Sequence, residues 1–302
     1  MTVVTTLRIG TRESRLALAQ ASLAVEVLHA VVGRTQLVPL TTRGDALSAR
    51  RPRGRWIATD GQFTGELERA LLERRVDLVV HSYKDLPTAA VPGLTIAAVL
   101  ERADPRDCLI APDGGGGLDD LPFGGRIGTS STRRAAQLAT ARADLIASPI
   151  RGNVETRLRR LEDGEYDGLL LAAAGLDRLG IAVAERARLP LDVMLPAPAQ
   201  GALAIQARSD DAQLLTALKE IEHVPTRIGV EAERALLRRI GGGCLAPLGA
   251  LGQVTDNTLR LRAAYEDESG VHVRAEMSGP ADRPSAVVEA VAAQMAQAGT
   301  AA

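Results

Sequence analysis

Two segments of this sequence each occur twice, and this internal repeat limits what the chain can fold into. Residues 8–11 and 126–129 both read Arg-Ile-Gly-Thr, and each is followed by hydroxyl residues and a segment typical of a helix start. Residues 71–77 and 161–167 both resemble the end of an amphipathic helix with an acidic turn, and each leads into an apolar strand. The same order of elements, a strand, a turn, a helix and a second strand, therefore occurs twice. This repeat predicts two α/β lobes of similar design.

Two hinge-like segments, residues 101–105 and 196–201, divide the chain. The apolar strand at 202–205 follows the second segment and is expected to return to the first lobe. We therefore predict a discontinuous lobe 1, residues 1–101 and 202–220, and a lobe 2, residues 105–197. Two crossings between the lobes predict a hinged cleft, which is the usual place for a ligand.

The last part of the chain has a different pattern. A helix is expected at residues 230–240. Two alternating segments, 259–265 and 271–277, are joined by an acidic turn that ends in Gly270, which is typical of a hairpin. An alanine-rich helix at 285–298 follows. These elements predict a small α+β domain in residues 223–302.

Composition excludes several classes of function. The net charge is −1 and aromatic residues make up 2%, so neither a basic field nor stacking platforms favour nucleic acid. No apolar run is long enough to cross a bilayer, and the first residues lack a secretion signal. Two cysteines make no disulfide framework. We expect a cytoplasmic monomer without membrane or nucleic-acid partners. The sequence also lacks a phosphate-binding loop, a dinucleotide fingerprint and histidines at metal-ligand spacing.

The start of the second lobe's first helix has the pattern of an anion site. Thr129, Ser130 and Ser131 precede this helix, and helix N-termini bind anions through free N–H groups and the helix dipole. Arg133 and Arg134 lie in its first turn, where positive charge opposes the dipole unless an anion is present. The alternative is a plain hydroxyl cap with two solvated arginines.

Further polar residues are expected at strand ends that face the same crevice. Arg12 and Ser14 take the related place in lobe 1, Arg151 ends a strand at 144–150, Arg157 lies on the next helix, and Arg178 follows the strand 169–173 and a turn at 174–177. So many charge-assisted contacts predict a ligand with several carboxylates, gripped by bidentate guanidinium groups.

Lys84 and Asp85 follow an apolar strand that begins at Val76. Only two of the 36 basic residues are lysines, Lys84 and Lys219, which favours a need for a compact ammonium at residue 84. A carboxylate among arginines makes sense if positive charge develops on a substrate or a proton moves, so Asp85 is the candidate catalytic residue. The alternative is a chance pair in a surface turn.

Cys244 follows three glycines at a helix C-terminus, a place that does not favour its thiolate. This setting fits a thiol that is covalently occupied, and the alternative is a small buried hydrophobic residue. Cys108 is expected to be a core residue.

Taken together, these segments resemble the porphobilinogen deaminase (hydroxymethylbilane synthase) family. The resemblance covers nearly the whole chain in the family's order. The matching segments are residues 11–14, 43–45, 81–87, 104–107, 128–134, 151–153, 173–176, 198–201 and 242–244.

The resemblance implies two lobes like type II periplasmic binding proteins, a third small domain, and an enzyme that links four porphobilinogen molecules head to tail into hydroxymethylbilane with release of ammonia. It implies a dipyrromethane cofactor held by a thioether to Cys244, and catalysis by Asp85. Residues 43–55 are rich in arginine, glycine and proline and are expected to form a mobile loop, or else an inert solvated insertion. The resemblance matches Phe63 to an aromatic residue of the lid, and Asp60, in the stretch 56–63, stands where a basic residue is common. The residues that match binders of the pyrrole carboxylates are Arg12, Ser14, Lys84, Thr129, Ser131, Arg133, Arg134, Arg151, Arg157, Arg178 and Gln200.

Two other interpretations remain open from the sequence. A non-catalytic carrier of polyanions with the same two lobes would explain the arginines but would leave Asp85 and Cys244 without a role. A paralogue that assembles its cofactor and works slowly is the second, and Asp60 is its only indication.

Overall fold

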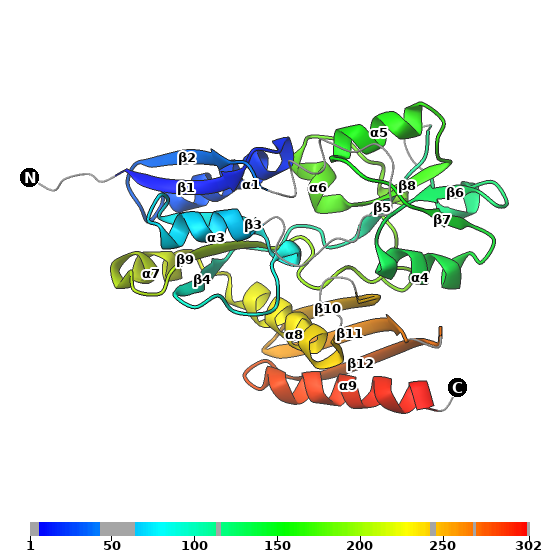
Figure 1. The fold of residues 1–302 in the computed structure, drawn as a ribbon. Coiled ribbons are helices and arrows are strands. Elements are labelled where there is room, and N and C mark those ends of the chain that lie inside the picture. The colour runs from blue at the N-terminus through cyan, green and yellow to red at the C-terminus, as the bar shows by residue number, and fades with distance from the viewer. Residues whose placement is uncertain (1–5, 43–63, 113–115, 242–245, 268–269, 301–302) are drawn as a thin grey trace, which may run out of the picture. The chain divides into compact units, whose positions relative to one another are not determined.

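The computed structural model describes residues 6–42, 64–112, 116–241, 246–267 and 270–300. The chain divides into two compact units, Met1–Arg102 with Ala202–Arg227, and Ala103–Gly201 with Ile228–Ala302. Figure 1 labels the helices and strands along the chain.

Unit 1 is built on a five-stranded sheet with the order β2-β1-β3-β9-β4. Helix α1 packs on the face that carries Ile9, Leu78 and Val80, whereas α3 packs on the face that carries Val79. The elements are β1 Leu7–Arg12, α1 Arg15–Leu28, β2 Thr35–Leu40, α3 Gly65–Leu72, β3 Leu78–Ser82, β4 Leu94–Val99, β9 Leu203–Arg208 and α7 Ala212–Leu218.

Strand β9 pairs antiparallel with both β3 and β4. The strand expected at 202–205 therefore does return to the first sheet, where all six of its residues are buried. The residue limits given for the domains stay predictions.

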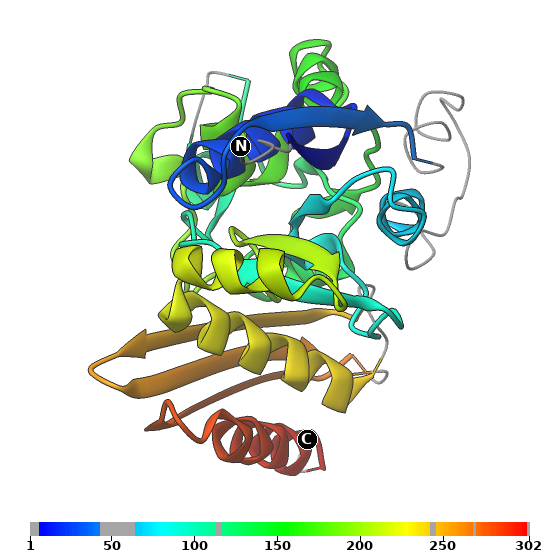
Figure 2. The ribbon, with the colours of Figure 1, turned by 90° about the vertical axis from the view of Figure 1, so that its left-hand side faces the viewer.

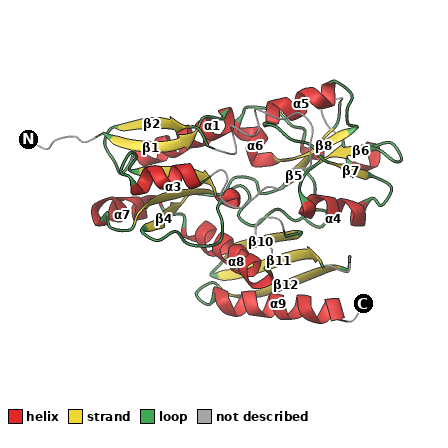
Figure 3. Cartoon of the chain, viewed as in Figure 1, coloured by secondary structure: helices red, strands yellow, loops and turns green. Residues whose placement is uncertain are grey.

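Unit 2 holds a four-stranded sheet with the order β5-β8-β6-β7. Figure 3 shows how helices flank the strands in each unit. The elements around this sheet are β5 Asp107–Ile110, β6 Arg126–Gly128, α4 Thr132–Ala141, β7 Ile146–Ser148, α5 Val154–Glu162, β8 Gly168–Ala172 and α6 Ala173–Arg178.

The two sheets share one topology, which confirms the similarity predicted from the repeat. The order β2-β1-β3-β9 corresponds to β7-β6-β8-β5, with the same pattern of two parallel pairs and one antiparallel pair. The same backbone-to-aspartate hydrogen bond, called the clasp below, precedes β3 and β8. Arg8 N donates to the Asp77 carboxylate at 2.9 Å, and Arg126 N donates to that of Asp167 at 2.7 Å.

The turn before each clasp repeats as well. Its backbone takes positive φ at Arg74 (56°) in unit 1 and at Gly164 (74°) in unit 2. Glycine adopts this conformation without steric cost, and arginine does not. The mixed α/β class is confirmed, and the hinged cleft stays a prediction.

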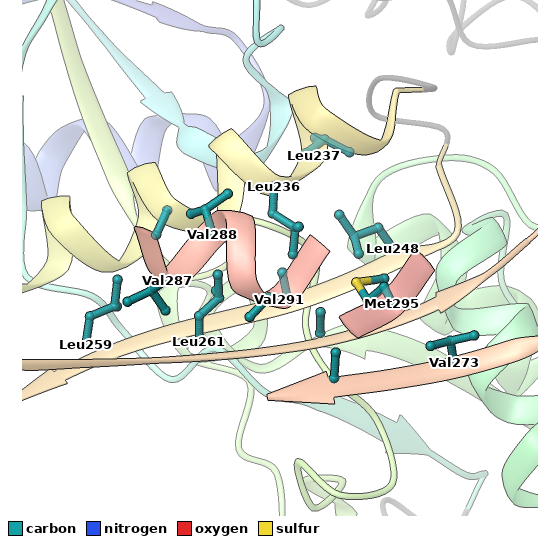
Figure 4. Packing of buried hydrophobic residues seen from close by; sticks show 14 of the residues in the cluster. Leu236, Leu237, Leu248, Leu259, Leu261, Val273, Val287, Val288, Val291 and Met295 are labelled. Atoms are coloured by element: carbon teal, nitrogen blue, oxygen red, sulfur yellow. The ribbon is translucent and has the colours of Figure 1, made fainter. Parts of the chain in front are cut away.

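The C-terminal part of unit 2 is a three-stranded antiparallel sheet, β10-β11-β12, with two helices. Figure 2 shows α8 and α9 running alongside the strands, and Figure 4 shows their side chains, Leu236 and Val291 among them, over Leu261 of the sheet. The bounds are α8 Val224–Ile240, β10 Leu248–Thr255, β11 Thr258–Glu266, β12 His272–Pro280 and α9 Pro284–Thr300.

The predicted hairpin and both predicted helices are confirmed, although α8 begins earlier than expected. Strand β10 was not predicted, because Gly249 and Gly252 interrupt its apolar pattern. Gly252 instead permits close contact with α8. A Cβ on Gly252 would lie 2.5 Å from the carbonyl oxygen of Gly229, so only glycine fits there.

Candidate active site

Asp85 and Lys84 lie where the sequence places them, at the carboxyl end of β3. They belong to a short 3₁₀ helix, Tyr83–Asp85, that follows the strand directly. Tyr83 is fully buried, and its N–H donates to the Ala202 carbonyl at 3.0 Å. Lys84 is half-buried and Asp85 is exposed. A buried tyrosine therefore anchors a turn that presents the carboxylate of Asp85 to solvent.

The strand behind this turn is braced on both faces. On the α1 face, the Ser82 hydroxyl and the Gln20 carboxamide are hydrogen-bonded, with Gln20 Nε2 donating at 2.8 Å. On the α3 face, buried His81 donates from Nε2 to Gln206 Oε1 at 3.0 Å. These contacts leave the end of β3 little freedom to move.

Burial and, to a smaller extent, the positive charge of Arg12 lower the pKa of His81 to about 4, whereas the hydrogen bond that His81 donates to Gln206 opposes this shift. His81 is therefore neutral at neutral pH. Neither Gln20 nor His81 was predicted as part of the site.

We expect His81 to make unit 1 sensitive to mild acid. The unfolded chain takes up this proton below about pH 6.5, whereas the folded chain takes it up only near pH 4. Stability is therefore lost as the pH falls through this window, by about 2 kcal/mol between pH 7 and pH 5. Urea unfolding at both pH values should show this loss in the wild type and a clearly smaller one in His81→Asn. Equal losses in both proteins would exclude His81 as the cause.

Arg12 and Ser14 are at the end of β1 and the start of α1. Ser14 is the N-cap of α1, and its hydroxyl oxygen accepts from Ala17 N at 3.3 Å. Arg12 is half-buried at the last position of β1. Both residues lie on unit 1 with Asp85, as predicted.

In unit 2, hydroxyl groups organise the start of α4. Ser131 is the N-cap and accepts from Arg134 N at 3.4 Å. Buried Thr129 accepts from Ser131 N at 3.2 Å. The predicted arrangement of strand, hydroxyl turn and helix start is present.

The anion expected beside Arg133 and Arg134 exists within the chain. Asp107, the first residue of β5, is fully buried and binds both guanidinium groups. Its Oδ2 accepts from Arg133 Nη1 at 2.7 Å, and its Oδ1 accepts from Arg134 Nε and Nη2 at 3.1 and 2.6 Å. Both arginines are buried, so the alternative of two solvated arginines is wrong. Their contact with a ligand stays a prediction.

Gln200 joins the same cluster. Its carboxamide nitrogen donates to Asp107 Oδ1 at 2.9 Å and to the Pro105 carbonyl at 2.8 Å. Ala199 before it has a positive φ of 61°, and its N–H donates to the buried Glu233 carboxylate on α8 at 2.5 Å. The segment that carries Gln200 is thus tied to both β5 and α8.

Arg151 and Arg157 lie near Arg134. Burial, and then the positive charges of Arg134 and Arg151, lower the pKa of Arg157 to about 10. Arg157 Nε donates to the Gly152 carbonyl at 2.8 Å. Burial and the two neighbouring positive charges each disfavour the charged form of Arg157, so a bound anion would stabilise it.

Arg178 ends helix α6, so the turn predicted at 174–177 is wrong: these residues continue helically from β8. Its Nη2 donates to the Gly201 carbonyl at 2.6 Å. Its Nε is buried without a hydrogen-bond partner among the described residues, and burial lowers its pKa to about 10. An unsatisfied buried donor of this kind fits a site for an anionic group.

Three residues named from the sequence, Cys244, Phe63 and Asp60, lie outside the described residues. Cys108 is fully buried in the core, as predicted, and burial raises the pKa of its thiol to about 12. Within the described part of the chain, no group of acidic, histidine or cysteine side chains could hold a metal ion. No helix there is long and apolar enough to span a membrane.

Comparison with known proteins decides the family. The family model described as "Porphobilinogen deaminase, dipyromethane cofactor binding domain" matches residues 7–216, and the model of the C-terminal domain of the same family matches residues 228–297. The chain belongs to the porphobilinogen deaminase family.

Curated relatives agree with the family models. A porphobilinogen deaminase of Desulforudis audaxviator is 49% identical over 96% of this chain and 94% of its own length. One of Roseiflexus sp. is 45% identical over 92% of each chain.

Among solved structures, a periplasmic substrate-binding protein of an ABC transporter from Coxiella burnetii aligns with a TM-score of 0.44 at 15% identity, over 76% of this chain and 97% of that chain.

As a member of this family, the chain is a transferase that joins four porphobilinogen molecules into hydroxymethylbilane, and its cofactor is dipyrromethane. When bound, the cofactor supplies the covalent anchor on which the product grows. The residues present fit such a group, because the half-buried cations Arg157 and Arg178 would each gain from carboxylates beside them. The interpretation as a non-catalytic carrier is set aside.

Proposed function

We propose that Asp85 is the catalytic residue of this reaction and that Cys244 is the cofactor attachment residue. Loss of ammonia from porphobilinogen leaves positive charge on the pyrrole and its methylene carbon. A carboxylate held by an anchored turn at a strand end can stabilise that charge, because it is already in place when the charge develops. The position of Asp85 in the turn after β3 supports this role.

Binding of the acid side chains is assigned to the remaining predicted residues. In unit 1 these are Arg12, Ser14 and Lys84. In unit 2, Arg133 and Arg134 use part of their donors on Asp107, so we assign them single contacts rather than bidentate forks. The other unit 2 residues of this set are Thr129, Ser131, Arg151, Arg157, Arg178 and Gln200.

The observation that carries this assignment is the uncompensated charge of Arg157 and Arg178: both are half-buried, Arg178 Nε has no hydrogen-bond partner among the described residues, and burial lowers the pKa of both groups. Guanidinium groups are rarely held in surroundings that disfavour their charge unless an anion compensates them. A pyrrole ligand that carries two carboxylates per ring supplies such anions at several places at once.

The decisive experiment is the mass of the intact purified protein. The wild type should exceed its sequence mass by two linked pyrroles, and Cys244→Ser should lack that increment. Cys108→Ser is the matched control and should keep the increment, because Cys108 is a fully buried core residue. A wild type of bare sequence mass, or a Cys244→Ser variant that keeps the adduct, would contradict the assignment.

We also propose that the protein works as a cytoplasmic monomer without membrane or nucleic-acid partners. The net charge of −1 and the 2% aromatic content support the absence of a nucleic-acid partner. Sedimentation equilibrium should then give a mass near 31.8 kDa plus the cofactor.

The interpretation as a slow paralogue predicts a different result: the purified protein would carry the full adduct but show weak turnover.

A further inference from the structure

Ser130 is part of the hydroxyl turn before α4, yet it does not cap that helix. Capping is done by Ser131, whose hydroxyl accepts from Arg134 N. The Ser130 hydroxyl instead donates to the Ile150 carbonyl at 2.7 Å and accepts from the Ile150 N–H at 3.1 Å. It therefore satisfies both backbone polar atoms of a residue 20 positions away.

These two bonds lengthen the pairing of β6 with β7. The parallel ladder ends at the pair Gly128 and Ser148, and Thr129 N then donates to the Ser148 carbonyl at 2.9 Å. Beyond that point, the side chain of Ser130 takes the place of a backbone partner for Ile150. The two loops that leave the sheet here are held together where the strands themselves have ended.

The turn after β7 is fixed from other sides as well. The Tyr166 hydroxyl donates to the Pro149 carbonyl at 2.8 Å, and Arg157 Nε donates to the Gly152 carbonyl at 2.8 Å. Gly152 has a φ of 106°, which favours glycine. Arg151 lies between these anchored residues and is itself exposed. The turn thus presents one arginine from a rigid backbone.

The fixed turn keeps Arg151 close to other positive charges, which is electrostatically unfavourable. The positive charge of Arg151, together with that of Arg134, disfavours the charged form of Arg157, so Arg157 is repelled by both neighbouring guanidinium groups. A flexible turn would let Arg151 move away. A fixed turn keeps the three cations together and ready for an anion, which reduces the ordering cost of binding.

We propose that Ser130 is a positioning residue that, through Ile150, holds Arg151 beside Arg134 and Arg157, so that they bind one carboxylate of a pyrrole ligand. This inference rests on the ligand-binding role proposed above for these arginines. Ser130 itself need not touch the ligand. Its function is to fix the backbone from which Arg151 extends.

The test compares Ser130→Ala with Ser130→Thr, which keeps the hydroxyl. Loss of two hydrogen bonds should raise the KM for porphobilinogen about tenfold in Ser130→Ala, with kcat within about twofold of the wild type. Ser130→Thr should return KM toward the wild-type value. A lower fraction of Ser130→Ala than of wild type should carry the pyrrole adduct, as measured by intact mass.

Thr140→Ala is the matched control. Thr140 is exposed on α4, the helix that follows Ser130, and its hydroxyl donates to the Ala136 carbonyl at 3.2 Å, so its removal should leave KM and adduct unchanged. An unchanged KM in Ser130→Ala, with active wild type, overturns the positioning role. A fall in thermal stability without a change in KM also overturns it, since that result assigns Ser130 to the fold alone. A wild type without adduct or turnover defeats the proposed function instead.

Discussion

Asp85→Asn should lower kcat by about two to four orders of magnitude, the range expected when a catalytic carboxylate is removed. Asparagine keeps the shape of the side chain and removes its charge. The residue is exposed in a short turn held by Tyr83 and Leu86, so the substitution should leave the fold intact. The midpoint of thermal unfolding should therefore stay within about 2 °C of the wild type, a shift that corresponds to less than about 1 kcal/mol.

Binding should survive this substitution. The predicted carboxylate-binding residues are untouched, so KM should change far less than kcat, and purified Asp85→Asn should still bind substrate in an equilibrium measurement. Glu73→Gln is a suitable control. Glu73 is an exposed carboxylate of the same unit that pairs with Arg75, and its loss should not alter turnover. Substantial turnover by Asp85→Asn would remove Asp85 from its assigned role.

Local patterns in the sequence predicted much of this fold. The repeat of Arg8 at Arg126 and of Asp77 at Asp167 indicated two similar sheets, and the structure shows the same backbone clasp at both places. Alternating apolar residues predicted the hairpin of β11 and β12. These features depend on short-range periodicity, which the sequence displays directly.

Elements shaped by contacts across the fold were harder to predict. Strand β10 contains Gly249 and Gly252, which weaken the strand pattern. Glycine is needed at both positions, because Leu195 lies too close to Gly249, and Gly229 too close to Gly252, to leave room for a side chain. Residues 174–177 resemble a turn because of Gly175, but they continue as helix α6. In both cases tertiary packing overrides the local preference of glycine.

The site showed the same division. Thr129, Ser131, Arg133 and Arg134 could be placed at a helix start from their spacing alone. Their partner could not, because Asp107 is 26 residues from Arg133 in the chain and is brought there by strand pairing. A carboxylate at the start of a buried strand indicates that it pairs with a cation, but the sequence holds many arginines and does not show which of them is the partner.

The second large effect is expected at Asp107. Asp107→Asn should reduce the free energy of unfolding by about 3–5 kcal/mol, because two buried guanidinium groups would lose their only shared counter-charge among the described residues. The two arginines hold the pKa of Asp107 well below its usual range, against the opposing effect of burial. Its stabilising contribution is therefore present above the pKa of the unfolded carboxyl, near pH 4, and is lost only as the pH falls well below that.

Urea unfolding at pH 7 measures this loss, and Glu276→Gln is the matched control. Glu276 pairs with Arg260 at 2.6 Å in the same unit, but both side chains are about half exposed, so its loss should cost less than about 1 kcal/mol. If the substitution at Asp107 cost no more than this control, the buried pairing would not stabilise the unit. Adding Arg133→Met to Asp107→Asn removes one of the two uncompensated charges, so the double variant should regain part of the lost stability. That recovery would show that unbalanced charge, rather than lost packing, is what the single variant suffers, because the second substitution removes further native contacts and would otherwise make the protein still less stable.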